Sequence, residues 1–158
     1  MDMLGPDPLI DLEKWLFRTN LEHRHIRDNE PALMGDNAVV HNSMVYNGCK
    51  IGGTVKNSIL FPGVHVKKDA VVENSVIFFS NTLGENCRLN KVVSDGNNNY
   101  GRNVVVGPEV CDAKTPVTRI GWNNKIPDQT TIGQGETVYP QIPARNWPVS
   151  LKPGEVLR

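Results

Sequence analysis

The sequence has few aromatic residues and no excess of charge of either sign. Phe, Trp and Tyr make up 6% of its 158 residues, and seventeen Lys and Arg balance seventeen Asp and Glu. A balanced chain has no strong basic field for a phosphate backbone, so we expect no nucleic-acid partner. No apolar run reaches the length of a membrane-spanning helix, so we expect no membrane partner either.

The sequence also lacks a cysteine framework. Cys49, Cys87 and Cys111 lie 38 and 24 residues apart. An odd number of cysteines at these spacings fits neither a set of disulfides nor a short zinc-ligand pattern. The first residues, up to Asp11, carry Pro and Asp where an export signal has a basic and then an apolar segment. We therefore expect a reduced, cytoplasmic protein.

What the sequence does contain is an internal repeat. Five stretches match one another, each beginning with an apolar or aromatic residue and ending four positions later in a small or slim one. Successive stretches start 17, 15, 17 and 17 positions apart, at Met34, Ile51, Val66, Leu83 and Tyr100. A second column, Asn42-Ser43, Asn57-Ser58 and Asn74-Ser75, runs in step with the first. A period of 17 fits neither a helix nor a series of hairpins.

Within each period, apolar residues recur about every six positions, as in Leu60, Val66 and Val72. The fourth residue after each apolar one is predicted to point inward as well, and these small residues are Val64, Ala70, Val76, Cys87, Val93 and Thr130. This is the pattern of the hexapeptide repeat, in which three flat sides make one triangular coil. Gly and Asn suit the corners because they tolerate positive φ. We predict an all-β, left-handed parallel β-helix of about five to six coils.

The ends of the chain depart from the repeat. We predict a linker or N-terminal cap over residues 1–33 and the hexapeptide-repeat β-helix over residues 34–138. A loop insertion at about 108–119, which contains two prolines, interrupts the period. Residues 139–158 are rich in proline and are predicted to be an extended tail, with Trp147 as an anchor.

One long stretch carries a family resemblance. The run from Val40 to Arg88, VHNSMVYNGCKIGGTVKNSILFPGVHVKKDAVVENSVIFFSNTLGENCR, resembles the β-helix of bacterial and plant glucose-1-phosphate adenylyltransferases and their non-catalytic homologues. The distinctive part is the repeated Asn-Ser followed by aliphatic residues and then Gly-Val or Gly-Cys. The start, Asp2 to Leu12, is similar to the family's linker between catalytic domain and β-helix, and a shorter similarity covers IGWNNKIPDQTTIG near the end.

The resemblance implies a parent protein that joins ATP and glucose 1-phosphate to give ADP-glucose and pyrophosphate, in glycogen or starch biosynthesis. The family binds ATP with a Gly-rich loop in an N-terminal nucleotidyltransferase domain, whereas Gly52-Gly53 here lies inside a repeat and is predicted to be a coil corner. We therefore predict no catalytic, cofactor-binding or metal-binding residue in this chain. It is expected to be a C-terminal regulatory and oligomerisation domain whose partners are the absent catalytic domain and like subunits.

Family members are regulated by sugar phosphates or inorganic phosphate, and a set of cations here is a candidate site for such an anionic effector. The set falls on neighbouring coils and consists of Lys67, Lys68, Arg88, Lys91 and Arg102. The competing interpretation is solvated surface charge, because Asp69, Glu73 and Glu85 interleave with these cations.

The alternative function is a stand-alone hexapeptide-repeat acyltransferase, with His65 or His41 as the general base. An exposed structural histidine is the simpler interpretation of both. His23 and His25 lie two residues apart with no third ligand in sight, so we predict no metal there. Cys49 and Cys87 occupy small inward positions and are predicted to be core residues.

Overall fold

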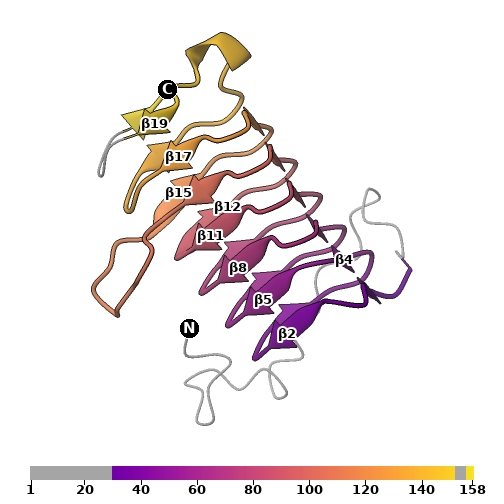
Figure 1. The fold of residues 1–158 in the computed structure, drawn as a ribbon. Coiled ribbons are helices and arrows are strands. Elements are labelled where there is room, and N and C mark those ends of the chain that lie inside the picture. Colours follow the sequence, from indigo (N-terminus) through magenta and orange to yellow (C-terminus); the bar gives the residue numbers. More distant parts are fainter. Residues whose placement is uncertain (1–29, 152–155) are drawn as a thin grey trace, which may run out of the picture.

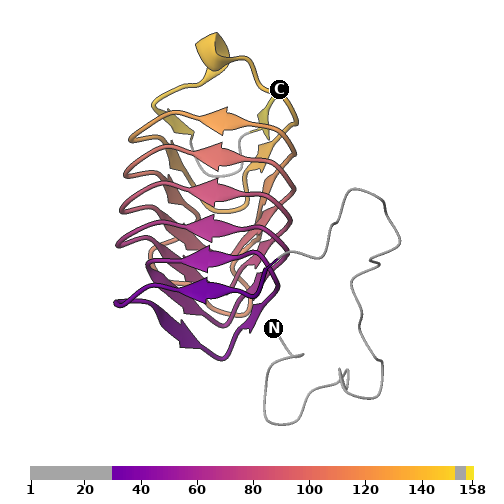
Figure 2. The same ribbon diagram turned by 90° about the vertical axis from the view of Figure 1, so that its right-hand side faces the viewer.

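The computed structural model describes residues 30–151 and 156–158. These residues form a three-sided prism in which each turn of the chain lays one short strand on each side (Figures 1 and 2). Every strand pairs in parallel with the equivalent strand of a neighbouring coil. The prediction of an all-β hexapeptide-repeat β-helix is confirmed.

Three parallel sheets make the three sides of the prism. Sheet A, which faces the viewer in Figure 2, contains β1 (Leu33–Met34), β4 (Lys50–Ile51), β7 (His65–Val66), β10 (Thr82–Leu83), β13 (Asn99–Tyr100) and β16 (Lys125–Ile126). Sheet B contains β2 (Val39–His41), β5 (Thr54–Lys56), β8 (Val71–Glu73), β11 (Arg88–Asn90), β14 (Val105–Val106), β17 (Thr131–Ile132) and β19 (Ser150–Leu151). Sheet C contains β3 (Met44–Val45), β6 (Ile59–Leu60), β9 (Val76–Ile77), β12 (Val92–Ser94), β15 (Thr118–Ile120), β18 (Thr137–Val138) and β20 (Val156–Leu157).

The repeat found in the sequence corresponds to the pairing of equivalent residues along sheet A. The five residues that open the matching stretches pair in order along the sheet, and they are Met34, Ile51, Val66, Leu83 and Tyr100. Sheet A has six strands, whereas sheets B and C have seven each. The described residues therefore make six complete coils and part of a seventh, slightly more than the five to six predicted.

The period of 17 arises because one side of each coil is shorter than the other two. The inward residues Val66, Val72, Ile77 and Leu83 are separated by six, five and six positions, and all four are buried. The short side is sheet C, where a residue with positive φ, such as Asn57, Asn74 or Lys91, turns the chain one or two positions before the strand. The prediction that Val76 and Val93 point inward is therefore wrong. Their neighbours Ser75 and Ile77, and Val92 and Ser94, fill the interior instead.

The core is a stack of equivalent side chains running through the prism. Aliphatic residues occupy most inward positions and are almost fully buried. Tyr100 is an exception in sheet A, and it is 1% exposed. Its hydroxyl lies 2.6 Å from the hydroxyl of Ser94, which takes an inward place that other coils give to an aliphatic residue. The buried phenol thus has the polar partner that it needs.

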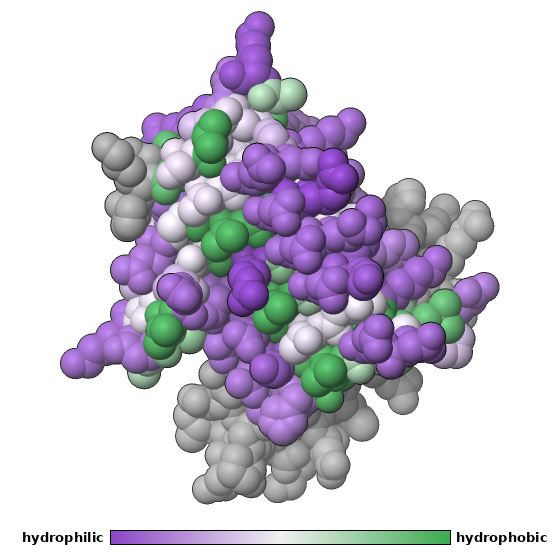
Figure 3. Space-filling view, in the orientation of Figure 1, coloured by the Kyte–Doolittle hydropathy of each residue, from purple (hydrophilic) through white to green (hydrophobic). Residues whose placement is uncertain are grey.

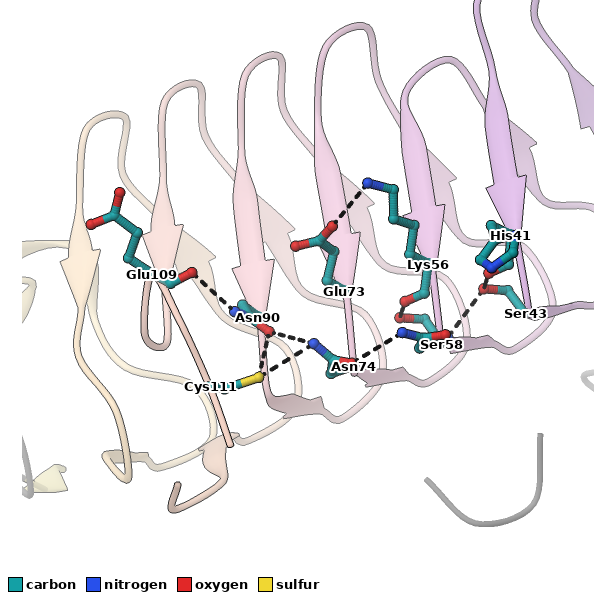
Figure 4. A network of polar contacts seen from close by, with 10 residues as sticks. His41, Ser43, Lys56, Ser58, Glu73, Asn74, Asn90, Glu109 and Cys111 are labelled. Atoms are coloured by element: carbon teal, nitrogen blue, oxygen red, sulfur yellow. Dashed lines mark hydrogen bonds and ion pairs between the residues drawn. The ribbon is translucent and has the colours of Figure 1, made fainter. Parts of the chain in front are cut away.

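Polar ladders hold the corner between sheets B and C. Asn42, Asn57 and Asn74 all have positive φ, and the side-chain amide of each donates to the amide oxygen of an asparagine one coil further on. Figure 4 shows the last of these links, from Asn74 to Asn90. Beside them, the hydroxyl of Ser58 donates to the Lys56 carbonyl at 2.7 Å and accepts the N–H of Ser75 at 3.1 Å. The predicted role of Asn at the corners is confirmed.

A second asparagine ladder is buried at the corner between sheets C and A. Asn81, Asn98 and Asn124 are each at most 1% exposed. The side-chain oxygen of Asn81 accepts the N–H of Asn98 at 2.9 Å, and that of Asn98 accepts the N–H of Asn124 at 2.7 Å. These buried amides satisfy backbone groups from one coil to the next, which links the coils vertically.

Two segments interrupt or finish the stack. Residues 107–117 leave it between β14 and β15 and project as the long loop seen in Figure 1. After β18 the chain forms the short 3₁₀ helix η2 (Ala144–Asn146), and Trp147 then packs against the core. Strands β19 and β20 follow and extend sheets B and C by one strand each.

Candidate anion-binding surfaces

The structure places the five predicted effector-binding cations on different parts of the prism. Lys67 directly follows β7 and borders sheet A, and Lys68 comes next at the corner between sheets A and B. Arg102 lies at the same corner two coils further on. Arg88 is on the outer face of sheet B, and Lys91 is at the corner between sheets B and C. These five side chains do not meet in one cluster.

Two of the five cations are engaged with neighbouring groups. The backbone N–H of Arg102 donates to Oδ1 of Asp128 at 2.8 Å, and Nε and Nη2 both donate to Oδ2 at 3.2 Å. These donors hold the pKa of the Asp128 carboxyl below its usual value. Lys91 donates from Nζ to the carbonyl of Asp112 at 3.2 Å, which ties the projecting loop to the stack.

Lys68 and Arg88 are both exposed to solvent. Lys68 is exposed, and its Nζ is 4.0 Å from Asp69, so it is a solvated surface charge. Arg88 lines a depression of about 350 Å³ together with Val71, Glu73 and the start of the projecting loop. Seen from the side of Figure 1, hydrophilic side chains cover most of the surface and the apolar ones are scattered between them (Figure 3).

Sheet A brings together cations that sequence reasoning did not combine. Lys50, His65 and Lys67 line one depression of about 420 Å³. Lys67 also borders a second depression of about 410 Å³, whose other cations are Arg102 and Lys125. Lys50 and Lys125 are absent from the predicted set. The signal that reveals Lys50 is the strand register, because Lys50 and His65 occupy the same position in successive coils.

The histidines differ in their surroundings. His41 is exposed at the end of β2, whereas His65 is partly buried in β7. Burial, and then the positive charges of Lys50 and Lys67, lower the pKa of His65. A histidine that acts as a general base is usually held in place by a hydrogen bond to a carboxylate. Among the described residues, no carboxylate makes such a hydrogen bond to His41 or His65. His23 and His25 lie outside the described residues.

Cysteines and the Gly-Gly pair have structural roles. Cys49 and Cys87 are fully buried, as predicted, and their thiols donate to the carbonyls of Phe61 at 3.2 Å and Gly101 at 2.8 Å. Burial raises the pKa of both thiols. Gly52-Gly53 forms a coil corner, where a Cβ on Gly53 would lie 2.1 Å from the carbonyl oxygen of Ala70. Within residues 30–151 and 156–158, no three His, Cys, Asp or Glu residues are placed to hold a metal ion.

The fold and these surfaces define a hexapeptide-repeat β-helix domain. The family model described as GlmU-like, C-terminal hexapeptide matches residues 31–119, which is 89 of 158 residues and more than half of the chain. The chain therefore belongs to this family.

Curated relatives give a more specific likeness. The chain is 31% identical over 125 residues to a glucose-1-phosphate adenylyltransferase of Acetivibrio thermocellus, a match that covers 73% of this chain and 29% of the relative. It is 32% identical over 110 residues to that of Desulfitobacterium hafniense, covering 68% of this chain and 28% of the relative. The chain thus spans less than a third of the length of these relatives. This likeness agrees with the resemblance seen in the sequence.

The likeness to solved structures is loose. The acetyltransferase domain of PglB from Neisseria gonorrhoeae FA1090 aligns with 18% identity and a TM-score of 0.34, over 82% of this chain and 50% of that one. A superposition this loose says nothing about function.

In the part of the chain that the structure describes, no helix has the length and apolar character needed to cross a bilayer.

Proposed function

We propose that this chain is the C-terminal regulatory and oligomerisation domain of a glucose-1-phosphate adenylyltransferase. The observation that carries the proposal is the match of 125 residues to such an enzyme, of which the chain spans only 29%. The parent protein joins ATP and glucose 1-phosphate to give ADP-glucose and pyrophosphate, in the cytoplasm. The chemistry belongs to a nucleotidyltransferase domain outside this chain. Three free cysteines among the described residues suit a reduced compartment.

The architecture suits a rigid docking body. Parallel ladders run through all coils, and two asparagine ladders and a serine ladder link the coils by side chains as well. A rigid body that contacts a catalytic domain can favour one of its conformations, and a coupling of about 1–3 kcal/mol suffices for regulation.

Sheet C offers an apolar surface for such contacts. Tyr46, Phe61 and Phe78 stack along its edge, with ring centroids 5.5 and 4.7 Å apart. The outward side chains Val76 and Val93 lie on the same sheet, and Val93 is 36% exposed. A stripe of aromatic and aliphatic side chains is the composition expected at the core of a protein interface. We assign it to the nucleotidyltransferase domain or to a like subunit.

A chimaeric enzyme tests the proposal. Residues 30–158 replace the matching segment of the Acetivibrio thermocellus relative, and ADP-glucose synthesis is measured with and without inorganic phosphate and a sugar phosphate. We expect an active oligomer whose rate responds to at least one of these anions. A control chimaera carries Val76→Lys, which places a charge in the apolar stripe and is expected to weaken assembly. If no anion changes the rate of the chimaera, the regulatory role is refuted. If Val76→Lys leaves assembly unchanged, the assignment of the apolar stripe as a contact surface is refuted.

A further inference from the structure

The two ends of the prism differ in how well their apolar interiors are covered. At the C-terminal end, Trp147 packs against the core, and Ile142 and Leu151 are only 6% and 7% exposed. At the other end, β1, β2 and β3 are the outermost strands of their three sheets. We call this the first-coil end, and Figure 2 shows it in indigo. Its three edge strands have no further described strand to pair with, an arrangement that proteins normally cover.

Inward side chains of the first coil are exposed at this end. Met34 pairs in register with Ile51, and Val40 pairs in register with Val55. Ile51 and Val55 have a coil on either side and are 1% and 0% exposed. Met34 and Val40 have a coil on one side only and are 51% and 39% exposed. The first-coil end therefore presents apolar side chains together with open strand edges.

The area of this end favours a segment of the same chain over a second molecule as its cover. Each side of a coil is about five or six residues long, or about 17–20 Å, so the triangular end has a flat area of about 150 Å². A stable interface between two proteins needs about 800 Å² from each partner. A tethered segment needs far less, because its tether keeps it at a local concentration in about the millimolar range.

The sequence that precedes the first coil has the composition of such a cover. Residues 1–29 lie outside the described residues. Within them, the run from Leu9 to Phe17, LIDLEKWLF, has six apolar residues among nine. One of these is Trp15, the same residue type that packs on the core at the C-terminal end. The run therefore offers an aromatic and aliphatic surface directly upstream of the open end.

The structure also fixes where this upstream sequence joins the prism. The carbonyl of Glu30 accepts the N–H of Gly48 at 2.6 Å, and Ala32 packs against the core. The chain thus reaches the prism at the first-coil end. Twelve residues, 18–29, separate Phe17 from Glu30. Twelve residues span at most about 40 Å, twice the width of the end, so the apolar run can reach all of it.

We propose that the segment from Leu9 to Phe17 covers the first-coil end, with its aromatic rings over Met34 and Val40. The cap buries the exposed inward side chains and shields the edges of β1, β2 and β3 from pairing with another chain. One tryptophan-bearing segment then closes each end of the prism. This inference concerns the chain itself and does not depend on the identity of the parent enzyme.

Methionine methyl groups report on this contact in the full 158-residue chain. The chain has four methionines, of which Met34 and Met44 lie on the first coil, so a methyl-labelled sample gives a simple NMR spectrum. We expect Overhauser contacts between the Met34 methyl group and the ring protons of Trp15 or Phe17. The double variant Trp15→Leu, Phe17→Leu should shift the Met34 signal. The control Trp122→Leu, at an exposed tryptophan after β15, should leave it unchanged.

A pair of variants on β2 gives an independent measurement. Val39 and Val40 are neighbours, 50% and 39% exposed, but Val39 is on the outer face and Val40 is on the inner one. At an open end, lysine at either position reaches solvent and both variants unfold at similar urea concentrations. Beneath an apolar cap, Val40→Lys places a charge out of water, so its urea midpoint should be lower than that of Val39→Lys by about 1 M or more.

The outcomes that would overturn the cap are distinct. One is a Met34 signal without contacts to any residue of the segment Leu9 to Phe17. Another is a pair of equal urea midpoints for Val39→Lys and Val40→Lys. A Met34 signal that changes with protein concentration, together with a dimer in sedimentation, would show that a second copy covers the end instead.

Discussion

Replacing Ser58 by alanine tests the serine ladder, which spans successive coils. Ser58 is fully buried, and its hydroxyl accepts the N–H of Ser75 at 3.1 Å. The hydroxyl also donates to the Lys56 carbonyl, but that carbonyl keeps a second donor, the N–H of Asn74 at 3.1 Å. The substitution therefore leaves one buried group, the Ser75 N–H, without an acceptor. An unsatisfied buried donor costs about 1–3 kcal/mol.

Urea unfolding, followed by far-UV circular dichroism and tryptophan fluorescence, measures this loss. With a slope of about 2 kcal/mol per molar urea, a loss of 2 kcal/mol lowers the midpoint by about 1 M. Ser150→Ala is the matched control, because Ser150 is exposed on β19 and should change the midpoint little. If Ser58→Ala unfolds at the same urea concentration as this control, the ladder does not contribute to stability as argued.

Three further predictions concern the corner, the thiols and pH. Gly53→Ala forces a Cβ against the Ala70 carbonyl and should lower the unfolding free energy by about 1–3 kcal/mol. In Gly35→Ala the nearest contact of the new Cβ is 3.3 Å, so the loss measured by the same urea assay should be less than half as large. A thiol reagent at pH 8 should label Cys111 quickly in the native chain, and Cys49 and Cys87 only after denaturation. The reason is that burial raises the pKa of the Cys49 and Cys87 thiols. Rapid labelling of all three would contradict the placement of Cys49 and Cys87 in the core. The folded-state pKa of His65 lies below its unfolded value, so its contribution to stability is present above about pH 6.5 and is lost as pH falls through the folded-state pKa. His65→Gln should therefore lose less stability than the natural chain between pH 7.5 and pH 5, and equal losses would refute this assignment.

The sequence predicted the repeat, the sheet A register and most of the core. These were accessible because inward residues recur at equal intervals on two of the three sides, as in Val66 and Val72. The third side is one residue shorter, since Asn74 turns the chain in the left-handed region. A constant spacing of six therefore misplaced Val76 and Val93, although the Asn74-Ser75 pair directly before Val76 marks the short side.

The charged surface was less accessible to sequence reasoning. Lys67 and Lys68 are adjacent in the chain, yet a corner separates the surfaces to which they belong, and only Lys67 borders the sheet A depression. Lys50 and His65 are 15 residues apart and become neighbours through the stacking of coils. Which cations share a surface depends on this register and on the corner geometry together.

The strands β19 and β20 near the C-terminus were not predicted from the sequence. The segments around β19 are rich in proline, and the two stretches that pair are short.

The most direct test of the account is whether the purified 158-residue chain makes pyrophosphate from ATP and glucose 1-phosphate. A coupled assay for released pyrophosphate measures this, with the Acetivibrio thermocellus relative as the positive control. Because we place the chemistry in a domain outside this chain, we predict no release above the rate without protein. Turnover by the chain alone would contradict the assignment of this β-helix as a regulatory and oligomerisation domain.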